Sequence, residues 1–196
     1  MRPFSSSFAA VDWARKVLAD KSTVFLDTET TGLGPDAEIC DIAVVDASGL
    51  VLFESLVATI SPIPAEASAI HHIFDEDLVG QPEWAEVMAA VCPLLADRQV
   101  IVYNASFDLT MMGQCSRRIG SSFPPGEWHC AMLAYAAFRA TAVGPRGHRW
   151  HKLDDAVLSF GGSPGGHRAA KDALACLAVV KGIAAATWIP TRLWNE

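Results

Sequence analysis

The chain is short of three features that would assign it to a common class of protein: long apolar runs, paired cysteines and an excess of basic residues. No stretch of its 196 residues is long enough, and free enough of charge, to span a bilayer. The opening segment, residues 1–20, lacks the apolar core of a secretion signal and is predicted to be an amphipathic helix. We therefore expect no membrane association and a cytoplasmic location.

The cysteines and basic residues exclude further classes. The five cysteines are widely spaced and form no C-x-x-C pair, which favours buried thiols over disulfide bonds or a zinc site. His148 and His151 lack a second ligand pair nearby, so we interpret them as part of a polar loop. The formal net charge is −7, which argues against a protein that coats duplex nucleic acid. It does not argue against an enzyme that grips a few terminal nucleotides through metal ions.

The remaining sequence predicts one domain of alternating strands and helices. A hydrophobic fraction of 51% excludes a disordered chain, and 196 residues suffice for a full core. Strands are expected at residues 23–27, 38–46, 50–60 and 99–103. Helices are expected at residues 7–20, 82–97, 106–119, 128–139, 153–160 and 168–185, with a loop at residues 140–149. This order indicates an α/β fold in which helices flank a mixed sheet.

Three short motifs carry four carboxylates and one histidine. They are DTETTG (residues 27–32), NASFD (residues 104–108) and HRAAKD (residues 167–172). Each carboxylate borders apolar sequence that should be buried, and buried carboxylates without basic partners need a cation. The motifs therefore predict a divalent-metal site.

The spacing within the motifs supports this interpretation. Asp27 and Glu29 leave the same face of a strand, about 6.5–7 Å apart at Cα, and are able to share a metal. Asp108 alone would be better explained as a first-turn helix acid, but Asn104 and Phe107 beside it would frame a ligand. A lone histidine is usually a surface or core residue, and the same holds for His167 without the acids.

His167 and Asp172 are 140° apart around a helix, so both cannot face one point if both are helical. The glycines before His167 allow it to lie in a loop while Asp172 lies on the helix. No Gly-Lys-Ser/Thr follows these glycines, which excludes a phosphate-binding loop of that type. Oxygen ligands suit magnesium or manganese, two such ions can hold a scissile phosphate, and a histidine can accept the proton of the attacking water.

On these motifs the sequence resembles the DEDDh exonucleases, the DnaQ-like branch of the ribonuclease H-like fold. The positions that match the family's acids and histidine are Asp27, Glu29, Asp108, Asp172 and His167. The resemblance implies a ribonuclease H-like mixed sheet in an exonuclease domain at residues 23–186. Residues 1–22 would be a helical extension and residues 187–196 a tail.

The resemblance also implies roles. The activity would be 3′-to-5′ hydrolysis that releases nucleoside 5′-monophosphates with two Mg²⁺ or Mn²⁺ ions. The metals would be bound by Asp27, Glu29 and Asp172, with help from Asp108, and His167 would be the general base. The substrate-side positions would be Thr30 and Leu33 at the terminal nucleotide, Phe107 at its base, and Asn104 and His71 at backbone and sugar. His71 is equally compatible with a purely structural role.

Within the family, residues 125–132 resemble exonuclease X, a small DNA exonuclease. However, His129 and Cys130 stand where many relatives carry an acid, which puts a role for that position in doubt.

The sequence leaves the substrate open. The first hypothesis is hydrolysis of single-stranded or frayed DNA 3′ ends. The second is an exoribonuclease of the oligoribonuclease or ribonuclease T type, because contacts to a 2′-hydroxyl are local. The acidic chain, without a strong basic run, favours DNA. The third is a proofreading module with a DNA polymerase or repair partner; the oligomeric state stays open.

Overall fold

A five-stranded mixed sheet forms the centre of the computed structural model, which describes residues 4–121, 125–140 and 148–187. The strands are β1 Val24–Thr30, β2 Ile39–Asp46, β3 Val51–Leu56, β4 Gln99–Val102 and β5 Glu127–Cys130. Their order is β3-β2-β1-β4-β5, with the first three antiparallel to one another and β4 and β5 parallel to β1. The predicted α/β fold with a mixed sheet is confirmed.

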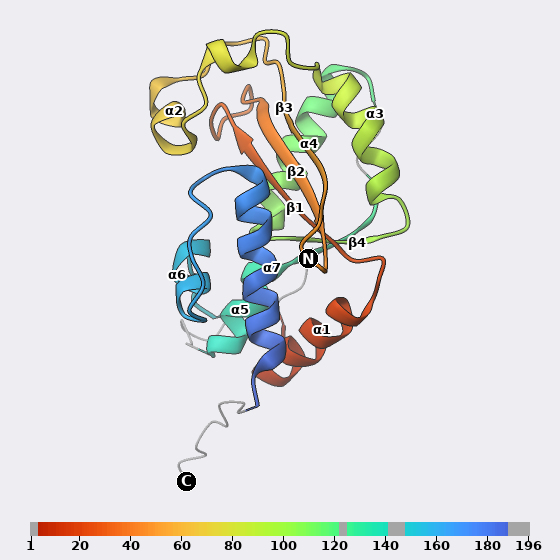
Figure 1. Ribbon diagram of the computed structural model, residues 1–196, viewed down its shortest axis with the longest axis vertical. Coiled ribbons are helices and arrows are strands. Elements are labelled where there is room, and N and C mark those ends of the chain that lie inside the picture. The colour runs from red at the N-terminus through yellow and green to blue at the C-terminus, as the bar shows by residue number, and fades with distance from the viewer. Residues whose placement is uncertain (1–3, 122–124, 141–147, 188–196) are drawn as a thin grey trace.

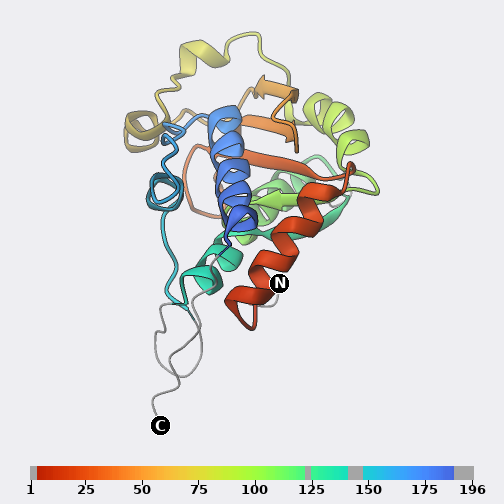
Figure 2. The ribbon, with the colours of Figure 1, turned by 60° about the horizontal axis from the view of Figure 1, so that its bottom comes forward.

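Helices cover both faces of this sheet (Figure 1). They are α1 Ser7–Ala19, α2 Ala65–His71, α3 Trp84–Leu95, α4 Ala105–Arg118, α5 Ala131–Arg139, α6 Leu153–Leu158 and α7 Ala169–Ala185, with a short 3₁₀ helix η1 at Asp75–Leu78. Figures 1 and 2 show α7 lying across the sheet with α1 beside it, while Figure 1 shows α4 behind the strands and α3 to their right. The two layers enclose a core that includes Phe25, Leu26 and Ile101, all fully buried.

Small side chains explain how closely α7 approaches the sheet. Ala169 and Ala170, at the start of the helix, form a buried cluster with Ala43 of β2. Larger residues at these positions would hold the helix away from the strand, because protein interiors are close-packed. The alanines therefore bring the first turns of α7, and any polar side chain on their inner surface, down to the strands.

The N-terminal helix is packed into the same core. Its N-cap, Ser6, accepts a hydrogen bond from the Ala9 amide at 3.2 Å, as expected for a helix start. Its buried side includes Val11 and Ala14, and the helix lies against α5 and α7. Trp13 of α1 also lies beside His129 of β5, with ring centroids 6.2 Å apart.

The predicted elements differ from the observed ones mainly at one edge. Residues 127–130, most of which were expected to start a helix, form β5, which pairs with β4, and the helix α5 begins only at Ala131. The helices α2 and η1 were not predicted. Residues 141–147 of the predicted loop and residues 188–196 of the predicted tail lie outside the described residues.

The cysteines are thiols, and most of them are buried. All five cysteines are free, and Cys40, Cys115, Cys130 and Cys176 are buried. Within the part of the chain that is described, no helix has the length and apolar character needed to cross a membrane.

Candidate metal centre and nucleic-acid site

The first two acids lie on the central strand under helix α7. Asp27 and Glu29 alternate with buried neighbours in β1 and pair with Ala43 and Asp41 of β2. Because side chains alternate along a strand, both carboxylates leave the same face, as the sequence predicts. Helix α7 packs against this strand, so the acids lie between sheet and helix.

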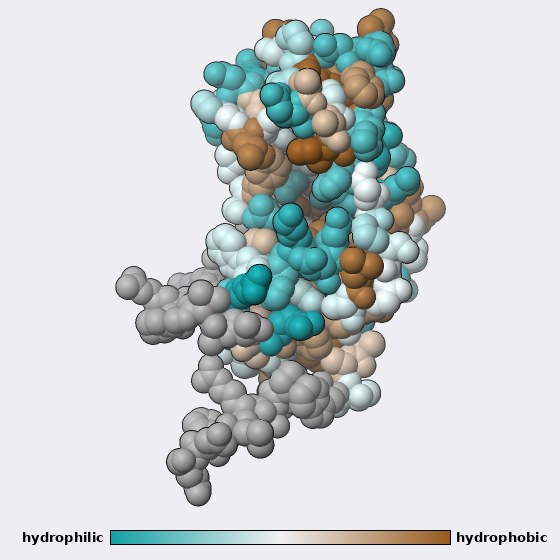
Figure 3. Space-filling model, turned by 90° about the vertical axis from the view of Figure 1, so that its left-hand side faces the viewer, coloured by the Kyte–Doolittle hydropathy of each residue, from teal (hydrophilic) through white to brown (hydrophobic). Residues whose placement is uncertain are grey.

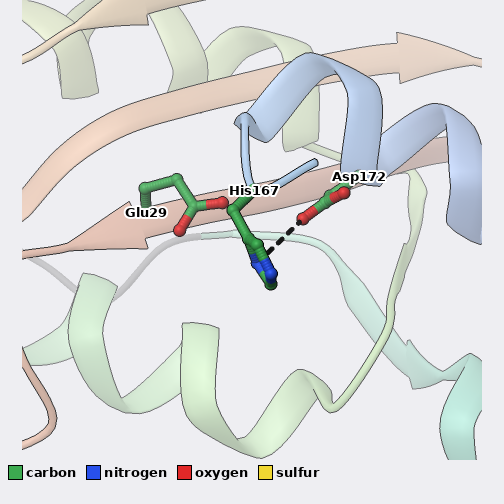
Figure 4. A group of neighbouring side chains, drawn as sticks. All are labelled: Glu29, His167 and Asp172. Atoms are coloured by element: carbon green, nitrogen blue, oxygen red, sulfur yellow. Dashed lines mark ion pairs between the residues drawn. The ribbon is translucent and has the colours of Figure 1, made fainter. Parts of the chain in front are cut away.

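The C-terminal motif approaches these acids from above the sheet. Asp172 lies in the first turns of α7, and His167 directly precedes the Arg168 N-cap with a left-handed φ of 56°. One ligand atom each of Glu29, His167 and Asp172 lies within 4.8 Å of the others. Figure 4 shows the imidazole between the two carboxylates, with His167 Nδ1 at 4.0 Å from Asp172 Oδ2. The loop placement of His167 and the helical placement of Asp172 agree with the sequence analysis.

Asp108 reaches the same region from the other face of the sheet. It lies in the first turn of α4 and is almost fully buried. Thr28, whose side chain leaves β1 opposite to Asp27, donates a hydrogen bond from its hydroxyl to Asp108 Oδ1 at 2.7 Å. This bond fixes the carboxylate near the sheet, and its charge is among those that act on Asp27.

The electrostatics of the group favour protonation in the absence of a cation. Burial, and then repulsion by Asp172 and Asp41, raise the pKa of Glu29 to about 8. Burial likewise raises the pKa of Asp108 to about 7 and that of Asp172 to about 6. Burial and the charge of Asp108 raise the pKa of Asp27 well above its ordinary value. Four acids that disfavour one another's charge are suited to bind cations.

Two observations indicate that the donor set fits a divalent ion. Asp172 Oδ1 is buried and makes no hydrogen bond within the described chain. Buried polar atoms are usually satisfied, so an unpartnered carboxylate oxygen in a group of acids is suited to a metal ligand. Gly165 lies so close to this oxygen that a Cβ atom there would overlap it. Among the described residues, Glu29, His167 and Asp172 form the one group with three such ligand atoms this close, and neither His148 nor His151 belongs to it.

One buried acid of the site was missed in the sequence. Asp41 of β2 is fully buried opposite Glu29, and its Oδ2 accepts hydrogen bonds from Arg168 Nε at 2.9 Å and from the Ala169 amide at 3.3 Å. The pair fastens the start of α7, next to His167, to the sheet. An acid inside the apolar run Ile-Cys-Asp-Ile-Ala was the available signal.

The loop between β1 and β2 presents the predicted wedge residue. Thr31 and Glu38 close the loop, with Thr31 N donating to Glu38 O at 2.8 Å and Glu38 N to the Thr31 hydroxyl at 3.0 Å. Leu33 stands on this loop and is 83% exposed. Thr30 is buried instead, and its hydroxyl donates to Gly32 O at 2.7 Å.

The other predicted substrate residues differ in accessibility. Asn104 is the N-cap of α4 with a left-handed φ of 67°, and both Asn104 and Phe107 are partly exposed. His71 is only 2% exposed, and its Nδ1 accepts a hydrogen bond from the Ile73 amide at 3.1 Å. The structure thus places Leu33, Asn104 and Phe107 where a ligand can reach them and His71 inside the protein.

The exposed side of the site lies on the face that carries α2 and α6. Figure 3 shows hydrophilic side chains gathered across the middle of this face. His129 and Cys130 lie apart from it, on β5, where His129 Nε2 is 3.4 Å from Glu127 Oε1 and Cys130 is buried. The position at which the sequence departs from many relatives is therefore engaged in contacts along β5.

Comparison with known proteins agrees with this geometry. The model of the RNase T family, described as exonuclease, matches residues 24–180. The uncharacterized exonuclease CP81 of Escherichia phage 186 is 38% identical over 179 residues, which cover 87% of this chain and 92% of that protein. DNA polymerase III subunit epsilon of Treponema pallidum is 29% identical over 175 residues, 85% of this chain and 78% of that protein.

A solved structure shares the fold. Exonuclease X in complex with 5′-overhanging duplex DNA superposes with a TM-score of 0.54 at 24% identity, covering 85% of this chain and 93% of that one. The family match spans the strands and helices that carry all five predicted catalytic residues. The chain therefore belongs to the RNase T family of DnaQ-like exonucleases and is a 3′-to-5′ exonuclease with a ribonuclease H-like fold.

Proposed function

We propose that the protein removes nucleotides from single-stranded or frayed DNA 3′ ends with two Mg²⁺ or Mn²⁺ ions held by its carboxylates. The observation that carries the proposal is the meeting of Glu29, His167 and Asp172, with ligand atoms within 4.8 Å of one another. Asp27 and Asp108 complete an acidic group in which neighbouring carboxylates help to raise the pKa values of Asp27 and Glu29. When bound, divalent ions would neutralise these charges, hold the scissile phosphate and activate a water.

Each residue then has a defined task. Asp27, Glu29 and Asp172 would hold the cations, and Asp108, which accepts a hydrogen bond from Thr28, would assist from the opposite face of the sheet. His167 accepts a proton from the attacking water as its oxygen bonds to phosphorus. The bond from phosphorus to the 3′ oxygen of the preceding nucleotide breaks, and that oxygen takes a proton from solvent. The products are a nucleoside 5′-monophosphate and a strand one nucleotide shorter.

The residues around this centre would hold the strand end. Leu33, 83% exposed on its loop, would wedge against the terminal base, and Phe107 would stack near it. Asn104 would position backbone and sugar, whereas Thr30 is buried and would act on the terminal nucleotide only through the loop that holds Leu33. His71 would act from behind the site, because its buried ring supports the loop that follows α2.

The charge of the chain supports a short grip on the end of the strand. With 22 acidic and 15 basic residues, the protein has little capacity to hold long nucleic acid through phosphates. A short grip on a free 3′ end through metals is compatible with this charge. Digestion of matched 5′-labelled DNA and RNA oligomers in Mg²⁺ tests the preference, and faster shortening of the RNA would show an exoribonuclease instead.

The site itself is tested by substitution. Asp27→Ala should abolish Mg²⁺-dependent shortening of the DNA while the circular dichroism spectrum is unchanged. His167→Ala should retain metal and strand binding and lose rate by about 10²–10⁴-fold. Asp12→Ala, which removes an exposed acid of α1, is the matched control and should have full activity. Undiminished turnover by Asp27→Ala would refute the proposed centre.

A polymerase-associated role is the second candidate. It is favoured by the 29% identity to a DNA polymerase III subunit epsilon across 78% of that subunit. Co-elution of the purified protein with the replicative polymerase of its own source would support a proofreading partner. Separate elution would leave a stand-alone exonuclease.

A further inference from the structure

A depression in the surface adjoins the proposed metal centre. It has a volume of about 520 Å³ and shares His167 and Asp172 with the acidic group. Its remaining walls come from the ends of β4 and β5 and from the segment that leads into α6. They are formed by Tyr103, Asn104, Met132, Trp150, His151, Lys152, Leu153 and Asp154.

The outer wall is fixed in place by two tyrosines. The Tyr103 hydroxyl, at the end of β4, donates a hydrogen bond to His151 O at 3.0 Å. The ring of Tyr135 of α5 meets the His151 ring edge-on, with centroids 5.3 Å apart. The segment on either side of His151 is therefore attached to the sheet and to a helix, and its neighbours are held over the depression.

Those neighbours are an aromatic ring and a cation. Trp150 is 66% exposed, an unusual position for a large apolar side chain. Lys152 is also exposed, two residues further along the same wall. An exposed indole offers a stacking surface to any base, and an ammonium group pairs with a phosphate. Both groups lie beside the carboxylates of the site, whose negative charges repel polyanions.

The strand order places this depression relative to the rest of the site. The loop that carries Leu33 joins β1 to β2, on one side of β1. Tyr103 and Met132 follow β4 and β5, on the other side of β1. A strand whose terminal nucleotide contacts Leu33 and whose scissile phosphate lies at the acids therefore continues towards Trp150.

We propose that the Trp150–Lys152 depression binds the nucleotide that adjoins the one being removed, by stacking of its base on the indole and pairing of its phosphate with the ammonium. The proposal rests on the proposed exonuclease function. Trp150 and Lys152 would bind the strand, whereas the acids and His167 would carry out hydrolysis.

Two substrates separate this binding role from catalysis. The p-nitrophenyl ester of thymidine 5′-monophosphate offers one nucleotide and no neighbour, whereas a DNA oligomer offers both. Trp150→Ala should raise KM for the oligomer by about 5- to 100-fold, leave its kcat within about twofold, and leave hydrolysis of the ester unchanged. Trp150→Phe should restore most of the affinity, because a smaller ring still stacks.

Lys152 is tested through salt. Lys152→Ala should weaken oligomer binding and lower the slope of log affinity against log salt by about one phosphate contact. Phe8→Ala and Lys181→Ala, which remove an exposed aromatic of α1 and an exposed cation near the far end of α7, are the controls and should change neither KM nor slope.

These measurements test the nucleotide subsite separately from the exonuclease function. An unchanged oligomer KM in Trp150→Ala, or an equal loss on the ester and the oligomer, would overturn the subsite. A wild-type protein that hydrolyses neither substrate in Mg²⁺ would overturn the proposed function instead.

Discussion

Asp41 is fully buried, yet it lies opposite Glu29 in a group of acids that already repel one another. Its partner is Arg168, 127 residues later, whose Nε is 2.9 Å from Asp41 Oδ2. Only the carboxylate of this ion pair is buried, since the Arg168 side chain is 38% exposed, but loss of Arg168 would leave Asp41 buried without its partner. Because Arg168 directly follows His167, the pair also sets where the imidazole lies.

Arg168→Ala should therefore lower both stability and rate. We expect a loss of roughly 1–3 kcal/mol in the free energy of unfolding, measured by urea denaturation, because Asp41 stays buried without its partner while the partly exposed Arg168 is screened by solvent. Asp41→Asn combined with Arg168→Ala should recover part of that loss, since the buried charge is gone. Rate should not recover in the double variant, because the start of α7 is no longer fastened beside His167.

The control for this prediction is an exposed ion pair. Lys16→Ala breaks the pair with Asp12, 2.7 Å apart and with both side chains mostly exposed. It should cost at most about 1 kcal/mol. If Arg168→Ala costs no more than Lys16→Ala, Asp41 does not depend on its partner.

The residues of the site differ in whether they could be predicted from the sequence. The acids of the three motifs were predictable because each stands next to an apolar run in a recognisable order. Asp41 and Trp150 were not, because their roles depend on partners far along the chain, such as Arg168 and the residues after β4. His71 shows the same limit, since burial of its ring depends on how α2 packs against β2.

At the scale of elements, the segment before α7 decides the geometry of the centre. Residues 161–166 contain four glycines, and they deliver His167 in a left-handed conformation to the start of the helix. Gly165 lies against the carboxylate of Asp172, with no room for a Cβ atom. The absence of a side chain at this position lets the loop pass directly over Asp172 Oδ1, a proposed metal ligand.

Gly165→Ala should displace the Asp172 carboxylate without unfolding the protein. Displacement of a ligand by about 1 Å is expected to weaken Mn²⁺ binding and to lower kcat by about 10- to 100-fold. Isothermal titration calorimetry with Mn²⁺ measures the first effect independently of activity. Gly34→Ala is the matched control, because a Cβ atom there meets nothing within 4 Å; equal Mn²⁺ affinity in both variants would contradict the prediction.

Most elements were predictable from apolar periodicity, and the exceptions have physical reasons. β5 reads Glu-Trp-His-Cys, with only Cys130 buried, so it lacks the apolar run that identified β1 and β4. It becomes a strand because the edge of β4 offers backbone partners, which local sequence does not reveal. The short helices α2 and η1 lie between stronger signals and were missed for the same reason.

At the scale of the molecule, we expect the acidic group to couple metal binding to stability. Glu29, Asp108 and Asp172 have raised pKa values of about 8, 7 and 6 in the folded chain, above their ordinary values of 4.5, 3.8 and 3.8. The metal-free folded state therefore binds more protons than the unfolded state between about pH 4 and pH 8. Its stability falls as pH rises through this range.

Divalent cations should reverse this loss. Because they bind the deprotonated carboxylates, the rise in Tm caused by 5 mM Mg²⁺ or Mn²⁺ over EDTA should be larger at pH 8 than at pH 5.5. Thermal unfolding at both pH values measures it. Asp27→Ala should reduce the rise at pH 8, whereas Asp12→Ala should not. A metal-induced rise that is equal at both pH values would contradict the linkage.

The separation of the acids along the chain has a consequence for synthesis. Asp172 leaves the ribosome 145 residues after Asp27, and α7 docks on a sheet that includes β4 and β5. Until then the acids of the nascent chain have not been brought together. The group of acids is therefore assembled only after nearly all of the domain has been translated and α7 has docked on the sheet.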